Sequence, residues 1–116
     1  MPSTTGFRQG DVVLVSFPFT DLTSVKQRPA VVISPDTFNG FNEDIVLAAV
    51  TSQITGDPAT VRVAVRDLTD GALPKDSVVR LTKLFTLHSS LVVKRLCRLR
   101  PEKKAELLRE IRSFFQ

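Results

Sequence analysis

Short apolar runs, each followed by turn-forming residues, are the feature that most constrains the fold of this chain. The runs have the length of β-strands, and Pro, Gly, Asn and Asp lie between them. No helical pattern alternates with them, so the sequence favours an antiparallel sheet or small barrel over a parallel sheet. We expect strands at 12–17, 29–34, 45–50, 59–67 and, as one bent strand, 77–81 with 83–87.

Four segments carry more specific signals. The strand at 59–67 alternates, with its valines on one face, which predicts a half-exposed antiparallel strand. The stretch at 35–44 contains Pro, Asn and an Asn-Gly pair, which are typical of turns. We expect Pro29 at the first position of its strand, where no ladder donor is needed, and a single helical turn near Ser89–Leu91.

The last segment predicts one amphipathic helix. Pro101 suits the first helical position, and Glu102 suits the positive end of the helix dipole. We interpret the apolar face as packing residues that cover the sheet; it comprises Leu107, Leu108, Ile111, Phe114 and Phe115. With 116 residues and 42% apolar side chains, the chain fits one domain over 1–116, of mainly β (α+β) class.

Charge is distributed unevenly along the chain. Residues 1–82 hold seven Lys and Arg against nine Asp and Glu, a balance of −2. Residues 83–116 hold nine against three, a balance of +6. This asymmetry suits an acidic partner, either nucleic acid or an acidic protein segment. The alternative is a basic C-terminal helix that is merely well solvated.

Cysteine and histidine content narrows the chemistry. The single cysteine, Cys97, excludes an intramolecular disulfide, and with the single histidine, His88, it argues against a zinc site. We interpret Cys97 as a core residue and His88 as a helix-start or packing residue rather than a proton shuttle. No apolar run reaches the length of a membrane span, and the N-terminus does not resemble a signal peptide. We therefore expect a cytoplasmic protein without metal or cofactor.

The remaining candidates for chemistry are polar residues at strand ends. Arg28 precedes the second strand, and Thr51, Ser52 and Gln53 follow the third. Pro29 holds the backbone of Arg28 extended, which restricts where the guanidinium can point. If the two strands are neighbours, a cation and hydroxyls converge in a set that suits attack of an RNA 2′-hydroxyl on its own phosphate. The alternative is ordinary loop polarity.

Three blocks in register carry a family resemblance. "GDVVLVSFPFTD" (10–21), "QRPAVVIS" (27–34) and "AAVTSQI" (48–54) resemble the MazF/PemK family of endoribonuclease toxins from type II toxin–antitoxin systems. "DSVVRLTKLFTL" (76–87) and the terminal helix are also similar to that family. The resemblance extends from about Gly10 to Phe115. It implies an SH3-like antiparallel β-barrel with a C-terminal amphipathic helix.

The resemblance also implies an activity and partners. Members are usually homodimers that cleave single-stranded RNA, often mRNA, without a metal, leaving a 2′,3′-cyclic phosphate and a 5′-hydroxyl. The family's catalytic arginine and threonine correspond to Arg28 and Thr51. A cognate antitoxin protein is the expected partner. Residues expected to support the site or touch RNA are Ser52, Gln53, Lys26, Lys83 and Thr20, while Gly10 and Asp11 are interpreted as structural, for the turn.

The chain departs from the family pattern before Arg28. Many members carry a longer glycine-containing loop with a glutamate there, whereas "TDLTSVKQ" (20–27) has neither. Any role of that glutamate therefore has no counterpart here, which leaves the general base unassigned, although Asp21 is near in sequence. Lys83 stands where members often carry glutamine. Two other functions stay open: a toxin of the same fold that acts on a protein such as DNA gyrase, and a noncatalytic barrel that binds RNA or protein.

Overall fold

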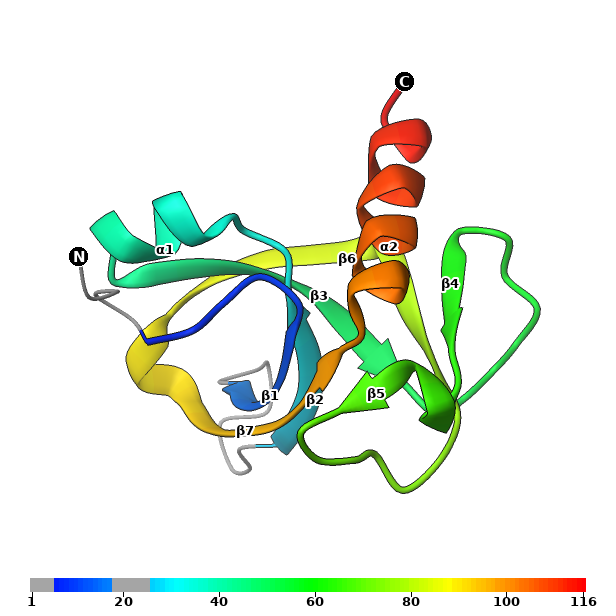
Figure 1. Ribbon diagram of the computed structural model, residues 1–116, viewed down its shortest axis with the longest axis horizontal. Coiled ribbons are helices and arrows are strands. Elements are labelled where there is room, and N and C mark those ends of the chain that lie inside the picture. Colours follow the sequence, from blue (N-terminus) through cyan, green and yellow to red (C-terminus); the bar gives the residue numbers. More distant parts are fainter. Residues whose placement is uncertain (1–5, 18–25) are drawn as a thin grey trace.

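The computed structural model describes residues 6–17 and 26–116 of the chain. Seven strands in this part form one antiparallel sheet with the order β4-β6-β3-β2-β1-β7-β5. The sheet curls into a nearly closed barrel (Figure 1), which confirms the expected fold class. The strands are β1 (Asp11–Phe17), β2 (Lys26–Val32), β3 (Asp44–Thr51), β4 (Thr60–Val63), β5 (Leu68–Thr69), β6 (Ser77–His88) and β7 (Val92–Leu99).

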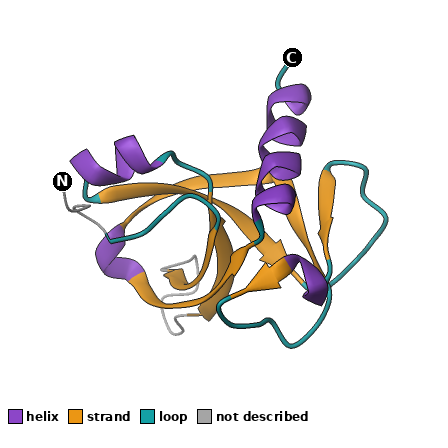
Figure 2. Cartoon of the chain, viewed as in Figure 1, coloured by secondary structure: helices purple, strands orange, loops and turns teal. Residues whose placement is uncertain are grey.

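Two α-helices and two short 3₁₀-helices complete the described part (Figure 2). They are α1 (Asp36–Phe41), η1 (Val65–Asp67), η2 (Ser89–Leu91) and α2 (Pro101–Phe114). The start of α2 at Pro101 and the helical turn at Ser89–Leu91 are confirmed. Leu107 anchors α2 in the core, being 1% exposed.

The far end of α2 corrects one expectation. Figure 1 shows α2 standing beside β4 and continuing away from the barrel. Phe114 and Phe115 are therefore 43% and 63% exposed, and they pack on each other with ring centroids 5.0 Å apart rather than on the sheet. The prediction that they cover the sheet is wrong, because the helix is longer than the surface beneath it.

The core consists of two clusters on opposite faces of the central strands. Val13, Ala30 and Val32 belong to one cluster, whereas their neighbours Val12 and Val31 belong to the other. Successive side chains of a strand point to opposite faces, so both faces of β1 and β2 are covered. This explains why these strands are continuous apolar runs rather than alternating ones.

Strand β2 begins earlier than expected. It starts at Lys26, so Arg28 lies inside the strand and not before it, and Pro29 is the fourth residue of the strand rather than the first. Pro29 pairs with Leu14 of β1, while the pairing of β2 with β3 begins only at Ala30. At Pro29 the strand thus has one partner strand, which is the position where a missing N–H is tolerated.

Two further segments differ from the sequence expectation. The stretch at 35–44 contains α1, whose buried Asn39 exchanges hydrogen bonds with Ser34. The strand expected at 59–67 ends at Val63 and turns into η1. Asp67 Oδ2 accepts from the backbone N of Ala64 at 2.8 Å, so a side chain takes a donor that a longer strand would need. By contrast, 77–87 does lie in one strand, whose register with β3 shifts once.

Candidate active site

The candidate site lies where β2 and β3 stop pairing. Their antiparallel register matches Ala30 with Ala49, and continuing it by two residues brings Arg28 opposite Thr51. Directly opposed residues of an antiparallel pair point to the same face. The adjacency of these two strands, on which the sequence interpretation depended, is therefore confirmed.

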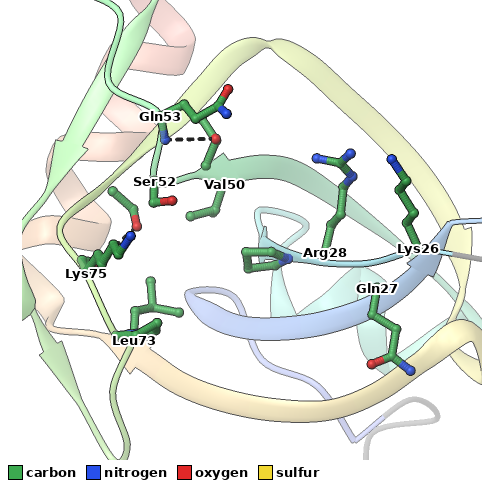
Figure 3. Close-up of a pocket in the computed structure, with 12 residues that line it drawn as sticks. Lys26, Gln27, Arg28, Val50, Ser52, Gln53, Leu73 and Lys75 are labelled. Atoms are coloured by element: carbon green, nitrogen blue, oxygen red, sulfur yellow. Dashed lines mark hydrogen bonds between the residues drawn. The ribbon is translucent and has the colours of Figure 1, made fainter.

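Two cavities open beside these residues. The first has a volume of about 740 Å³, and Figure 3 looks into it. It is lined by Lys26, Gln27, Arg28, Pro29, Val50, Thr51, Ser52, Gln53, Leu73, Pro74, Lys75 and Ser77. In this view Arg28 and Lys26 point to the same side of β2, and Ser52, Leu73 and Lys75 form the facing wall.

The second cavity has a volume of about 720 Å³ and follows β6. It is lined by Arg28, Pro29, Ala49, Val50, Thr51, Gln53, Arg80, Thr82, Lys83, Leu84, Phe85, Thr86 and Leu87. Arg28 and Thr51 line both cavities. They therefore form part of the wall that the two cavities share, where one extended substrate occupying both would have to pass.

Positive charge at the site is uncompensated within the described residues. Arg28 is exposed, and its guanidinium has no hydrogen bond or ion pair with any described residue. No described lining residue of either cavity is an Asp or Glu. Cations without an internal partner attract an anion from solution, and a planar guanidinium can bind two oxygens of a phosphate at once.

Thr51 is half-buried and its hydroxyl is oriented from within its own loop. Its Oγ1 accepts a hydrogen bond from the backbone N of Gln53, with 3.1 Å between the two atoms (Figure 3). A hydroxyl that accepts this bond still has its own hydrogen to donate. It can donate that hydrogen to an oxyanion in the cavities.

The other residues expected at the site divide between the cavities. Gln53 lines both, Lys26 and Ser52 line the first, and Lys83 lines the second. Thr20, and with it Asp21, lies outside the described residues. The structure thus brings together all the predicted site residues that it describes.

Sequence interpretation missed two cations at the site. Lys75 lines the first cavity, and Arg80 lines the second and a smaller cavity of about 110 Å³ that also includes Thr51. Arg80 follows two apolar residues in a predicted strand, so its alternation with Val79 could have marked it as outward-facing. Lys75 lies in a turn-rich link and offered no comparable signal.

Three residues outside the cavities behave structurally, as expected. His88 begins η2, because its Nδ1 accepts from the backbone N of Ser90 at 3.2 Å. Cys97 is fully buried, and burial raises the pKa of its thiol to about 11, which suits a core residue. Asp11 Oδ2 accepts from the backbone N of Arg8 at 3.0 Å, which closes the turn.

The described part of the chain has neither a metal-binding cluster nor a membrane-spanning helix. Residues 6–17 and 26–116 contain no cluster of three or more His, Cys, Asp or Glu side chains that could hold a metal ion. Among the same residues, no helix is both long and apolar enough to cross a membrane.

Comparison with known proteins connects this geometry to a family. Residues 8–115 match the family described as "PemK-like, MazF-like toxin of type II toxin-antitoxin system". An endoribonuclease MazF from Staphylococcus saprophyticus is 30% identical over 101 residues, which is 86% of this chain and 83% of that protein.

Solved structures with the same fold include two toxins. MazF in a MazE–MazF complex from Deinococcus radiodurans superposes with a TM-score of 0.75 at 24% identity, covering 94% of this chain and 95% of that one. The Mycobacterium tuberculosis toxin MazF-mt6 superposes with a TM-score of 0.72 at 16% identity, covering 90% and 95%. With the family match over nearly all of its length, the chain belongs to the PemK-like and MazF-like toxins of type II toxin–antitoxin systems.

Proposed function

We propose that the chain is an endoribonuclease that cleaves single-stranded RNA, including mRNA, without a metal ion. The 2′-hydroxyl loses its proton and its oxygen attacks the adjacent phosphorus. The bond from phosphorus to the 5′-oxygen breaks and that oxygen takes up a proton, so the products carry a 2′,3′-cyclic phosphate and a 5′-hydroxyl. The observation that carries the proposal is that Arg28 and Thr51 line the wall shared by two cavities. The name of the Staphylococcus saprophyticus relative, endoribonuclease MazF, supports it.

Arg28 stabilises the phosphorane in this reaction. The attack places additional negative charge on the phosphoryl oxygens, and a fixed cation aimed at them lowers the barrier. The guanidinium lacks a competing partner among the described residues, so it needs no rearrangement to receive the phosphate. Arg28 lies on a strand that pairs with β1, where its partner is Val15, and this pairing limits the motion of the Arg28 backbone.

Thr51 orients the reacting groups. Its hydroxyl donates a hydrogen bond to a phosphoryl oxygen, while the hydroxyl oxygen accepts a hydrogen bond from the backbone N of Gln53. The described lining has neither a carboxylate nor an imidazole. A guanidinium is a poor proton acceptor at neutral pH, so we assign Arg28 and Thr51 to charge stabilisation and orientation, and not to removal of the 2′-hydroxyl proton.

RNA on either side of the cleaved linkage occupies the two cavities. Lys26 in the first cavity and Lys83 and Arg80 in the second are positioned to neutralise flanking phosphates. Ser52 and Gln53 offer hydrogen bonds to sugar or base edges. Binding should weaken as salt rises, because each phosphate contact releases counterions.

Inhibition by a cognate antitoxin and a homodimeric state belong to the same proposal. The Deinococcus radiodurans MazF was solved with MazE, and a mycobacterial endoribonuclease was solved with its cognate antitoxin. An acidic antitoxin segment would be attracted by the same uncompensated cations that attract RNA. Bound there, it would stop cleavage and relieve inhibition of translation and growth.

The test is cleavage of a long single-stranded RNA in EDTA. Wild type should cut it, whereas Arg28→Ala and Thr51→Ala should be about 100-fold slower or worse. Arg109→Ala is the matched control, because Arg109 is an exposed residue of α2 outside both cavities. The fragments should accept a 5′-phosphate from polynucleotide kinase without prior phosphatase treatment.

Two outcomes would redirect the proposal. If alanine variants cut as well as wild type, Arg28 and Thr51 are not the catalytic pair. If wild type leaves RNA intact and yet arrests growth in cells, a protein target such as DNA gyrase becomes the better candidate function.

A further inference from the structure

The segment Leu73–Ser77 forms a wall of the first cavity that no sequence signal indicated. Leu73, Pro74, Lys75 and Ser77 all line the cavity. Figure 3 shows Leu73 and Lys75 on the side across from Arg28 and Lys26. A substrate in this cavity would therefore lie between cations on both sides.

Buried side chains and a hydrogen bond hold the backbone of this wall in place. Leu73 is 7% exposed and belongs to the larger core cluster, and Ser77 is 4% exposed. Ser77 Oγ donates to the carbonyl oxygen of Lys75 at 3.1 Å, which fixes the backbone that carries the lysine. The preceding Pro74 restricts the backbone further.

The carboxylate next to Lys75 is directed elsewhere. Asp76 Oδ1 accepts from the backbone N of Val65 at 2.9 Å, and Oδ2 lies 3.8 Å from Arg62. The ammonium of Lys75 has no hydrogen bond or ion pair with any residue that the structure describes. Lys75 is thus an uncompensated cation on a rigid backbone, and the same is true of Arg28.

We propose that Lys75 binds a phosphate next to the cleaved linkage and so positions the RNA. The inference rests on the proposed ribonuclease function and adds a residue to it. Arg28 lines both cavities, whereas Lys75 lines only the first. A chain that presents its reacting phosphate to Arg28 therefore presents a neighbouring phosphate, on the first-cavity side, to Lys75. Lys75 is a positioning residue and does not contact the reacting atoms.

Binding of an uncleavable RNA separates this role from catalysis. The probe is a single-stranded oligonucleotide with 2′-O-methyl groups throughout, which lacks the attacking hydroxyl. It carries the sequence cut by wild type, or a mixture of all four bases if wild type cuts none. Lys75→Gln should weaken binding by roughly three- to tenfold, Lys75→Arg should restore it, and the salt slope should fall by about 0.7.

Lys94→Gln is the matched control. Lys94 is an exposed lysine of β7 that lines neither cavity, so its loss removes the same charge without removing the contact. It should leave affinity and salt slope close to wild type. Equal weakening by Lys75→Gln and Lys94→Gln would overturn the proposal, because the effect would then be one of net charge alone.

Probes with a single uncharged linkage show which phosphate Lys75 contacts. In a series of the same probe, each phosphate in turn is replaced by an uncharged methylphosphonate. Wild type should lose affinity when a linkage adjoining the cleavage position is neutral, and Lys75→Gln should be insensitive to that one replacement. If the variant responds to every replacement as wild type does, or if wild type does not bind the probe, Lys75 has no such contact.

Cleavage of ordinary RNA tells the two proposals apart. With excess unmodified RNA, Lys75→Gln should raise KM while kcat changes little, unlike Arg28→Ala, which should lower kcat. If wild type binds the methylated probe but cuts no RNA, the ribonuclease proposal fails while the binding series still decides the role of Lys75. If Lys75→Gln lowers kcat with KM unchanged, the positioning role is wrong.

Discussion

The hydroxyl oxygen of Thr51 accepts a hydrogen bond from the backbone N of Gln53, with 3.1 Å between them. This contact spans two residues at the end of β3, so the loop after the strand orients a side chain on the strand itself. It leaves the hydroxyl hydrogen free to donate into the cavities that Thr51 lines. The side chain is therefore oriented before substrate arrives.

Replacing Thr51 by valine and, separately, by serine distinguishes the contribution of its hydroxyl group to cleavage from that of its side-chain volume. Thr51→Val keeps the volume and removes both the acceptor and the donor, so we expect kcat to fall about 100- to 1,000-fold, as for loss of an oxyanion donor. Thr51→Ser keeps the hydroxyl and should retain most of the activity. The measurement is single-turnover cleavage of one labelled RNA. Equal rates for the two variants would exclude a role for the hydroxyl.

Arg28 should not be replaceable by lysine. A lysine at this position would keep the charge but present a compact ammonium where the guanidinium offers a planar fork to two phosphoryl oxygens. We expect Arg28→Lys to lower kcat by about tenfold or more and to bind uncleavable RNA nearly as well as wild type. Arg109→Lys is the matched control, because Arg109 is an exposed residue of α2 outside both cavities, and it should leave kcat unchanged. A kcat for Arg28→Lys equal to that of wild type would reduce Arg28 to a binding charge.

The proximity of Arg28 and Thr51 could be predicted from the sequence, because it depends on the local pattern of the two strands. Two apolar runs of strand length identify β2 and β3, and consecutive strands tend to be neighbours. What the pattern missed was the start of β2 at Lys26, since Pro29 was expected to be the first residue of the strand. The residues before it pair with β1, an arrangement set by the partner strand and not by the propensity of Lys26 or Gln27.

The cations Lys75 and Arg80 could not be assigned to the site from the sequence. Arg80 reaches it because β6 pairs with β3 and passes Thr51, whose partner is Val78. Lys75 reaches it because the link before β6 is drawn in by buried Leu73. Such long-range pairing depends on the closure of the whole barrel. The end of β4 could not be predicted either. Asp67 and Asp76 accept hydrogen bonds from the backbone N–H groups that follow β4, and local propensity does not reveal these contacts.

Gly71 should be the least replaceable glycine among those described. Its φ is +134°, and a Cβ there would lie 2.0 Å from the carbonyl oxygen of Leu96. Neither the backbone of β7 nor that of the loop can yield easily, so we expect Gly71→Ala to lower the free energy of unfolding by about 3 kcal/mol or more. Urea unfolding followed by circular dichroism measures this.

Gly56→Ala is the matched control for Gly71→Ala. Gly56 also has a positive φ, +79°, but a Cβ there meets no atom within 4 Å. Its replacement should cost only the backbone strain, about 1 kcal/mol. If both variants lose the same stability, the contact with Leu96 contributes nothing, and backbone conformation alone accounts for the effect.

The Cys97 thiol should be inert in the folded protein. It is fully buried, and burial raises its pKa from 9.0 to about 11, with Arg95 opposing and Asp11 adding to the rise. Because the thiolate is the reactive form, iodoacetamide should modify Cys97 slowly at pH 8 and quickly in 6 M guanidinium chloride. Fast modification of the native protein would mean that β7 opens readily.

The same pKa shift makes stability depend on pH in the alkaline range. Between pH 9 and about 11 the unfolded chain loses the Cys97 proton while the folded chain keeps it. The folded state then binds more protons, so the free energy of unfolding falls as pH rises, with a slope of at most about 1.4 kcal/mol per pH unit from this group. The chain has no tyrosine, and its lysines are unchanged in Cys97→Ala. Wild type should therefore lose more stability than Cys97→Ala between pH 8.5 and 10.5; parallel losses would show that the thiol titrates alike in both states.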